Sequence, residues 1–285
     1  MNKEEFEKIL KEDKKIIDKF FEEKFKDDNP LNEALSYATN SGKRIRPIVF
    51  METCKMLLKK EHLDEDIIKA GISLEMVHAY SLVHDDLPCM DDDDYRRGKP
   101  SVHKKFGEDI AVLVGDSLLS LAFEDLGNLA LGGQRFLKSL NYLARACGKD
   151  GMIKGQVYDI RKDYKKNLNY ILDVYKNKTS RLFMAATSMA GHIGDQKEEN
   201  IKKLEDYAYY LGLSFQIQDD ILDIGEEDEL NILSCLSLNK TKNLLAEFNQ
   251  KAKSSIKEFN NNDFHIYLID YLTERTKWKN ILDRD

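Results

Sequence analysis

Apolar residues recur every three or four positions along most of the chain, with charged residues between them. This spacing places the apolar side chains on one face of a helix, whereas a strand would alternate them at every second position. The 285 residues include only four prolines, and we find no Pro- or Gly-rich linker. The pattern therefore predicts an all-α protein with one domain over residues 1–285.

The same spacing gives the expected helices. They cover residues 3–26, 31–39, 64–87, 110–126, 134–146, 151–162, 168–190, 197–224, 240–258 and 263–278. The helix at 110–126 is so strongly apolar that it should be buried all round or lie at a subunit contact. The first helix should pack on the core or on a partner subunit through one apolar stripe, made of Phe6, Ile9, Leu10, Ile16, Ile17, Phe20 and Phe21.

The composition narrows the class of protein. A net charge of -7 and a sequence pI of about 5.5 argue against nucleic acid as a bulk partner, although local basic patches stay possible. No apolar run approaches the roughly 18 residues of a membrane span, and the charged N-terminus does not resemble a signal peptide. Cytoplasmic localisation fits the four scattered cysteines, which look like reduced thiols: Cys54, Cys89, Cys147 and Cys235.

One stretch carries most of the candidate chemistry. Six of the ten residues from Asp85 to Asp94 are aspartates, and Arg96 and Arg97 follow. Crowded carboxylates repel one another unless a cation neutralises them. Carboxylates without clustered His or Cys favour Mg2+, which commonly takes further ligands from phosphate. Guanidinium groups bind phosphate bidentately. An isolated acidic run is more often a solvated loop, so the flanking sequence has to decide.

A second acidic cluster lies far downstream in FQIQDDILD, residues 215–223. Asp219 and Asp223 are four residues apart and share one helix face, and Gln216 lies one turn before Asp220. Two such acidic faces opposite each other would hold several Mg2+ ions around one diphosphate.

At this point the chain resembles the trans-isoprenyl diphosphate synthases, in particular the bacterial farnesyl diphosphate synthases or geranyltranstransferases. DDLPCMDDDDYRRG and FQIQDDILD look like the family's two aspartate-rich motifs. GKRIRP (residues 42–47), GQ (155–156) and KT (178–179) follow the family's order. The resemblance implies an isoprenoid-synthase-type helical bundle around a deep central cavity. It also implies a homodimer with a subunit interface near residues 110–126.

The resemblance implies a Mg2+-dependent prenyltransferase that joins isopentenyl diphosphate to dimethylallyl or geranyl diphosphate, with farnesyl diphosphate as product. Three Mg2+ ions are expected with bound diphosphate, and Mn2+ is a possible substitute. The principal metal ligands would be Asp85, Asp91 and Asp219. The remaining aspartates would complete or orient the metal shell, namely Asp86, Asp220 and Asp223.

The basic and polar motifs receive substrate roles from the same resemblance. Arg96 and Lys178 would complement the allylic diphosphate, while the Thr179 oxygen would face the developing carbocation and Gln216 would assist there. Isopentenyl diphosphate would be held by Lys43, Arg46, His78 and Arg97. Asp159 would either orient the site or form a surface ion pair.

Product length should depend on the helix that precedes the first motif. Ser81 lies four residues before Asp85, and Tyr80 flanks it at the edge of the same face. The growing hydrocarbon should run back along this helix, so the Tyr80 ring would form the cavity floor. The resemblance implies that an aromatic residue at this place goes with fifteen-carbon products. The competing interpretation is that Tyr80 only packs in the core.

The segment after Asp223 departs from the family. IGEEDELNILSCLSL passes almost directly into the next helix, without the family's glycine-rich segment and two further lysines. Either the lid is short or a flexible stretch is missing from the sequence. The alternatives are therefore a geranylgeranyl or geranyl diphosphate synthase, or a low-activity regulatory subunit. A class I terpene cyclase and a phosphohydrolase using the pair His84 and Asp85 rank lower, because their further metal motifs are missing.

Overall fold

The computed structural model describes residues 1–161, 167–224 and 230–274, and it confirms the all-α prediction. Its α-helices are α1 (Lys3–Lys24), α2 (Pro30–Thr39), α3 (Ile45–Leu58), α4 (Glu65–Asp85), α5 (Val102–Phe106), α6 (Glu108–Ala130), α7 (Gln134–Cys147), α8 (Met152–Arg161), α9 (Leu168–Tyr175), α10 (Arg181–Ile193), α11 (Glu198–Leu222), α12 (Leu238–Ile256) and α13 (Asp263–Thr273). A π-helix η1 (Lys176–Ser180), a 3-10 turn η2 (Ile232–Ser234) and the two-residue antiparallel strands β1 (Tyr95–Arg96) and β2 (Lys99–Pro100) complete the described part.

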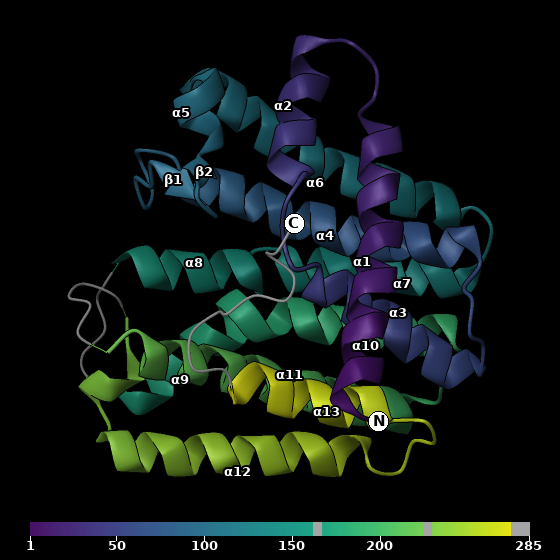
Figure 1. The fold of residues 1–285 in the computed structure, drawn as a ribbon, viewed down its shortest axis with the longest axis vertical. Helices are drawn as coiled ribbons and strands as arrows, with labels where there is room; N and C mark the ends of the chain where they lie inside the picture. The colour runs from purple at the N-terminus through teal and green to yellow at the C-terminus, as the bar shows by residue number, and fades with distance from the viewer. Residues whose placement is uncertain (162–166, 225–229, 275–285) are drawn as a thin grey trace.

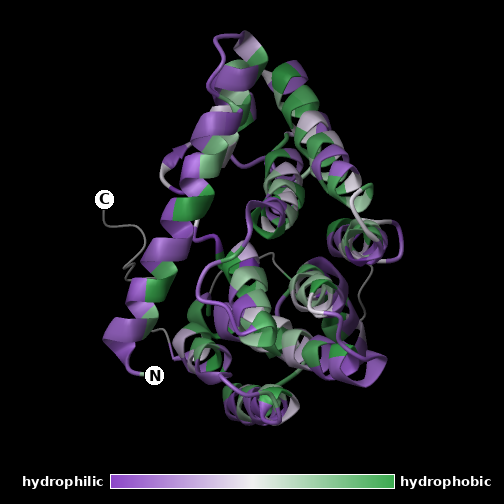
Figure 2. Cartoon of the chain, turned by 90° about the vertical axis from the view of Figure 1, so that its right-hand side faces the viewer, coloured by the Kyte–Doolittle hydropathy of each residue, from purple (hydrophilic) through white to green (hydrophobic). Residues whose placement is uncertain are grey.

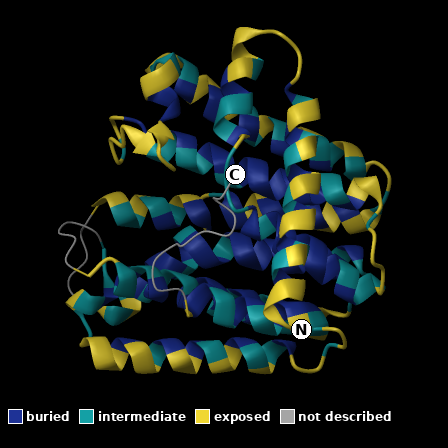
Figure 3. Cartoon of the chain, in the orientation of Figure 1, coloured by how far each residue is buried: buried dark blue, intermediate teal, exposed yellow. Residues whose placement is uncertain are grey.

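The longer helices lie roughly along one direction, and α1 and α2 run across them (Figure 1). Seen from the side, the hydrophilic faces of the helices point outward and the hydrophobic faces inward (Figure 2). The interior helices α3, α4 and α10 are buried over most of their length, whereas α12 at the edge of the bundle alternates buried and exposed residues (Figure 3). Among the described helices, none has the length and apolar character needed to cross a membrane.

The first helix packs as expected, with one correction. Ile16 was predicted to belong to the buried stripe, but 41% of its surface is exposed. The buried stripe instead contains Asp13 together with Phe6, Leu10, Ile17 and Phe21. These positions are spaced by three or four residues. Ile16 is one residue before Ile17 and therefore points about 100° away.

Arg44 joins α1 to the rest of the bundle. It has a left-handed backbone conformation, with φ of 55°, and its side chain is 2% exposed. The guanidinium donates to Asp18 of α1 and to Glu75 of α4, in both cases over 2.9 Å, and also to the Thr39 carbonyl. Two carboxylates and a carbonyl therefore satisfy this buried cation. GKRIRP thus contains a structural arginine besides its candidate substrate ligands.

The predicted helix over 168–190 is interrupted. The chain forms α9, then one π-helical turn, then α10. The turn lies between two glycines of neighbouring helices. A Cβ on Gly155 of α8 would overlap the backbone of Lys178, and one on Gly212 of α11 would lie 2.5 Å from the Ser180 hydroxyl. Both neighbouring helices can therefore approach this turn only because these positions lack a side chain.

Three other segments differ from the expectation. The loop predicted after Ser101 contains the short helix α5, and the helix predicted at 110–126 extends over Glu108–Ala130. That helix is not buried all round, because Val112 and Leu113 are 41% and 53% exposed. The last predicted helix ends at Thr273, with Glu274 as its C-cap, and residues 275–278 of the prediction lie outside the described residues.

Two buried acids, Asp13 of α1 and Glu52 of α3, share the half-buried Lys55. Lys55 Nζ lies 2.7 Å from both Asp13 Oδ1 and Glu52 Oε1. Burial raises the pKa of Glu52 to about 7, since one lysine only partly offsets desolvation and the nearby Asp13. The folded protein therefore binds a proton at this cluster more tightly than the unfolded chain.

This linkage predicts the effect of Glu52→Gln on stability. Between the ordinary glutamate pKa of 4.5 and about 7, the folded state keeps a proton that the unfolded chain has lost, so stability falls as pH rises. The neutral amide removes this penalty, on the order of 2–3 kcal/mol above pH 7. We expect Glu52→Gln to raise the urea midpoint at pH 8 but not at pH 4.5. An equal change at both pH values would contradict the assigned cause.

Candidate active site

A cavity of about 1310 Å3 opens between the helices, and most of the predicted site residues line it. They come from both acidic motifs, from the basic motifs and from the Tyr80 region: Lys43, Arg46, His78, Tyr80, Ser81, Asp85, Arg96, Arg97, Lys178, Thr179, Gln216 and Asp219. Four predicted residues are not part of its lining, namely Asp86, Asp91, Asp220 and Asp223. The fold therefore brings together segments that are more than 170 residues apart in the sequence.

The first acidic motif begins at the last residue of α4. Asp85 is half-buried at the cavity wall, and the Asp91 backbone N–H donates to the Asp85 carbonyl over 2.8 Å. This turn brings the exposed Asp91 next to Asp85. Burial raises the pKa of Asp85 to about 7, and Asp91 adds to the increase while Lys178 opposes it. Asp85 is therefore protonated more readily than an exposed aspartate.

Asp86, by contrast, already has a cationic partner. It is 3% exposed, and Arg96 donates to it through Nε over 2.8 Å and also through Nη2. Arg96 Nη2 also donates to Asp93 over 2.9 Å. Arg96 lies on β1, so this bonding attaches the short hairpin to the end of α4. The side chain of Asp86 orients the hairpin in this arrangement, and Arg96 reaches the cavity beside it.

Lys178 projects from the π-helix toward the first motif. Its ammonium group is bonded to Asp159 of α8 and is also attracted by Asp85 and Asp91. Asp159 therefore forms an ion pair with a partly exposed lysine, and its orienting role stays a prediction. The Thr179 hydroxyl donates to Gln216 Oε1 of α11 over 3.0 Å.

The aspartates of the second acidic motif lie in different surroundings. Asp219 lines the cavity. Asp220 is 4% exposed and accepts hydrogen bonds from the Tyr175 hydroxyl and from the Ile232 backbone N–H, the latter over 2.7 Å. Burial raises the pKa of Asp220 to about 7 although these donors stabilise the carboxylate. Asp220 thus fixes η2, and the exposed Asp223 ends α11.

A group of basic residues, Lys43, Arg46 and Arg97, also lines the cavity together with His78. Arg46 Nη1 donates to His78 Nε2 over 3.2 Å, and the guanidinium lies over the Phe183 ring, 4.8 Å from its centre. Burial and neighbouring arginines lower the pKa of His78 well below its usual value, so the ring stays neutral and accepts this bond. Arg97 donates to the Ser41 carbonyl over 2.6 Å and passes across Gly42, where a Cβ would meet its Nη1 at 2.5 Å.

The remaining wall is apolar. Tyr80 is 6% exposed, and the neighbouring Ser81 hydroxyl donates to the His78 carbonyl over 2.9 Å. One side of α8 faces this part of the cavity, and its residues are joined there by others from α6, α10 and α11: Met152, Ile153, Val157, Ile160, Leu119, Phe183 and Phe215. A hydrocarbon chain would fit against this wall.

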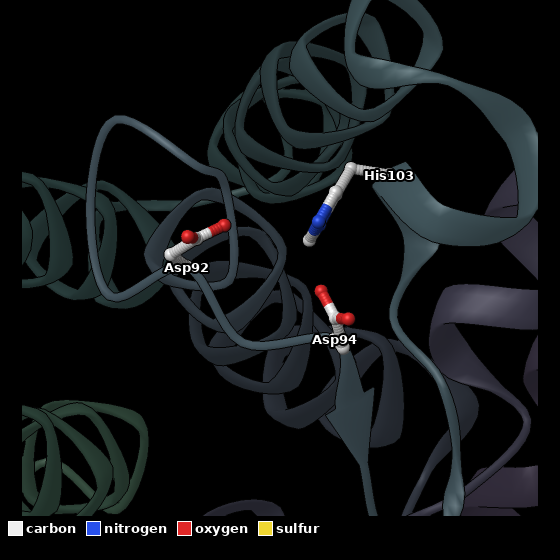
Figure 4. Close-up of side chains that lie close together, drawn as sticks. All are labelled: Asp92, Asp94 and His103. Atoms are coloured by element: carbon white, nitrogen blue, oxygen red, sulfur yellow. The ribbon is translucent and has the colours of Figure 1, made fainter.

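A different group of possible ligands lies outside the cavity. Asp92, Asp94 and His103 place ligand atoms within 4.8 Å of one another, and the His103 ring points between the two carboxylates (Figure 4). Asp94 also pairs with Lys104 over 2.7 Å. This group contains neither Asp85 nor Asp91, the first-motif aspartates that the sequence nominated as principal ligands.

The family model for polyprenyl synthetases matches residues 28–233, which is more than half of the chain. The chain belongs to the polyprenyl synthetase family. This assignment confirms the predicted resemblance, and with it the prediction that the protein is an enzyme of the trans-prenyltransferase type.

Several relatives of this synthetase cover most of its length. A farnesyl diphosphate synthase from Micrococcus luteus is 38% identical over 264 residues, which is 87% of this chain and 90% of the relative. A chloroplastic geranylgeranyl pyrophosphate synthase 7 from Arabidopsis thaliana is 40% identical over 205 residues, 70% of this chain and 58% of the relative.

Solved structures show the same fold. An apo FPP/GFPP synthase from Zymomonas mobilis is 34% identical with a TM-score of 0.87, covering 94% of this chain and 99% of the other. A geranyltranstransferase from Thermotoga maritima is 26% identical with a TM-score of 0.81, covering 93% and 97%. The synthetase therefore has the helical isoprenoid-synthase fold that the motifs predicted.

The donor set of the synthetase fits a hard cation. Asp85 and Asp219 bring carboxylate groups from the two acidic motifs to one cavity, with Asp91 beside Asp85, and such oxygen donors are the ligands that Mg2+ prefers. Sequence reasoning assigned no role to Arg44 or His84. A count of the basic residues can suggest that Arg44 has a role. No local sequence pattern indicates which residues the His84 side chain contacts.

The Asp85 pKa predicts pH-dependent metal binding by the synthetase. Protonation of Asp85 competes with a cation, so affinity should fall as pH drops below about 7, by up to roughly tenfold per unit. Calorimetric titration with Mn2+ at pH 8, 7 and 6 measures this dependence. Asp85→Asn should bind weakly with a flatter pH profile. If wild type and Asp85→Asn show the same pH dependence, another group controls binding.

Proposed function

We propose that this synthetase is a Mg2+-dependent farnesyl diphosphate synthase, which condenses isopentenyl diphosphate head-to-tail with dimethylallyl or geranyl diphosphate. The observation that carries the proposal is the shared cavity. Asp85 and Asp219 line it from α4 and α11, the basic residues Lys43, Arg46 and Arg97 line it as well, and Tyr80 is among its lining residues. The M. luteus relative, whose printed name is farnesyl diphosphate synthase, supports the same product.

The allylic diphosphate would lie between the two acidic motifs. Asp85, Asp91 and Asp219 would hold the Mg2+ ions, with three expected when diphosphate is bound and Mn2+ as a substitute. These ions supply positive charge that stabilises the departing diphosphate. Asp86, Asp220 and Asp223 would act indirectly, since Asp86 holds Arg96, Asp220 holds η2 and Asp223 ends α11.

Lys178 would bind the allylic diphosphate directly. Asp159 and the two first-motif carboxylates keep its ammonium group charged, because they raise the pKa of Lys178 above its usual value despite burial. Arg96 would contribute a second cation from the hairpin. Both side chains already point at the acidic wall, so the enzyme needs little reorganisation to neutralise the diphosphate.

Isopentenyl diphosphate would be bound by the basic region formed by Lys43, Arg46, His78 and Arg97. Burial lowers the pKa of Arg46 to about 10, which still leaves the guanidinium charged at neutral pH. His78 stays neutral and orients Arg46 through their bond. The two diphosphates are thereby held by different residues, which favours the correct mutual orientation of the reacting carbons.

The reaction then proceeds by three bond changes. The allylic C–O bond breaks, and its electron pair leaves with the diphosphate. The C=C electrons of isopentenyl diphosphate form the new C–C bond, and a proton is lost to the released diphosphate. Thr179 and Gln216, bonded to each other at the cavity wall, would direct an oxygen toward the allylic cation. The mechanism requires no protein base.

We further propose a cytoplasmic homodimer. All four cysteines are free thiols, and Cys54 and Cys147 are buried. The exposed apolar residues Val112 and Leu113 of α6 belong to the helix for which the sequence predicts a subunit contact.

Residues 225–229 of the segment after Asp223 lie outside the described residues.

A geranylgeranyl diphosphate synthase is the second candidate, because relatives such as the A. thaliana protein carry that name. The buried Tyr80 ring favours the shorter product, since it occupies the wall along which a longer chain would grow.

The direct test is incubation with isopentenyl and dimethylallyl diphosphates. We expect fifteen-carbon product with Mg2+ and none after chelation. Asp85→Ala and Asp219→Ala should each lower kcat by at least about 10²-fold, because each removes part of the transition-state charge stabilisation. Asp206→Ala, an acid on the outer part of α11, serves as the control. Near-normal kcat in Asp85→Ala or Asp219→Ala would exclude the proposed metal site.

Arg46→Ala tests the division between the two diphosphate sites. We expect KM for isopentenyl diphosphate to rise at least about tenfold, with a smaller change for geranyl diphosphate, since Arg46 contacts only the former. Steady-state kinetics with each substrate varied in turn measures both values. Arg135→Ala, an exposed arginine of α7, controls for the loss of charge. Equal KM increases for the two substrates would show that the sites are divided wrongly.

Tyr80→Ala tests the cavity floor. One isoprene unit is roughly as long as one helical turn of 5.4 Å, so removal of the ring should admit at least one further condensation. We expect chromatography to show a shift from fifteen-carbon to twenty-carbon or longer products. Tyr80→Phe keeps the ring and should keep the wild-type distribution. An active Tyr80→Ala enzyme with unchanged products would mean that Tyr80 only packs in the core.

A further inference from the structure

His84 lies on the last turn of α4, directly before Asp85, but its ring turns toward α6. The Nε2–H group donates to the Val112 carbonyl over 3.1 Å. This bond fixes which ring nitrogen carries the proton, since a carbonyl oxygen can only accept. It also directs Nε2 away from the acidic residues. His84 is therefore oriented by α6, although it borders the same cavity as Asp85.

The ring fits between the two helices because α6 has a glycine there. A Cβ on Gly115 would overlap the His84 imidazole at three of its atoms, Nε2, Cδ2 and Cε1. Gly115 is buried and has an ordinary helical backbone, so the absence of a side chain, and not a special φ, is what this position provides. The imidazole thus occupies a volume that a side chain of α6 would otherwise fill.

The opposite side of the imidazole contacts Tyr80. The two ring centres are 5.9 Å apart, and the planes meet at 80°, the edge-to-face geometry that aromatic pairs prefer. His84 and Tyr80 are four residues apart on α4, so they are neighbours on one helix face. Both border the cavity. The imidazole therefore contacts both the Tyr80 ring and the backbone of α6.

We propose that His84 is a positioning residue for product length: held by Gly115 and the Val112 carbonyl, it keeps the Tyr80 ring in place as the cavity floor. The inference rests on the proposed function. Without the imidazole, Tyr80 can turn into the space beside α6 and the cavity deepens. With a methyl group at position 115, the imidazole is displaced toward the cavity, which becomes shallower. The two changes therefore act in opposite directions.

The experiment compares four full-length variants for their products from isopentenyl and dimethylallyl diphosphates with Mg2+. They are His84→Ala, Gly115→Ala, the double variant and Gly127→Ala. Gly127 is the matched control, because it lies on the same helix and a Cβ there would meet no atom within 4 Å. The readout is the ratio of twenty-, fifteen- and ten-carbon products, which a simple loss of folded enzyme does not change.

We expect His84→Ala to raise the ratio of twenty- to fifteen-carbon product at least about threefold, and Gly115→Ala to raise the ratio of ten- to fifteen-carbon product by a similar factor. The double variant should lose the shortening effect of Gly115→Ala, because the added methyl no longer meets a ring. Gly127→Ala should match wild type. If Gly115→Ala does not fold, recovery of folded protein in the double variant still tests the contact.

Wild-type product ratios in His84→Ala, or a shift of both single variants in the same direction, would overturn the proposal. So would complete inactivity of folded His84→Ala, since the residue would then act at the reacting end. The failure of the proposed function is distinguishable: a wild-type enzyme that makes no prenyl diphosphate refutes the function, whereas an active wild type with unchanged variant ratios refutes only the role of His84.

Discussion

The concentration of negative charge at the mouth of one cavity is the constraint on which the rest of the structure depends. Six aspartates within ten residues cannot all be exposed to one another without strong repulsion. The fold relieves part of this repulsion with its own cations, since Arg96 binds Asp86 and Asp93, and Lys104 binds Asp94. Asp85 and Asp91 remain facing Lys178, and this remaining charge is what makes the cavity suitable for cations and diphosphate.

Much of the fold and site follows from the sequence because both depend on local spacing. The period of three to four residues gave nearly every helix of the described part, and the two acidic motifs identified Asp85 and Asp219 as partners in one cavity. These inferences succeed because side chains at fixed spacings on a helix must share a face. Family motifs then supplied the basic residues that spacing alone could not assign.

What the sequence did not predict depends on contacts between distant elements. The π-helical turn is closely approached by α8 at Gly155 and by α11 at Gly212, and no periodicity within 168–190 reveals it. By sequence, Asp220 belongs to an acidic motif. In the structure its carboxylate accepts hydrogen bonds from Tyr175 and Ile232, and these bonds make it an anchor for η2. Likewise, the orientation of His84 is set by Val112 and Gly115 on another helix.

The π-helical turn also limits how this part of the chain can vary among related proteins. One additional residue in a helical turn rotates every following side chain by about 100° relative to those before it. Lys178 within the turn and Phe183 after it line the same cavity. Loss of a single residue between Lys176 and Ser180 would turn α10 relative to α9 without changing either helix. Related proteins should therefore tolerate substitutions in this turn much better than insertions or deletions, although the segment contains no loop.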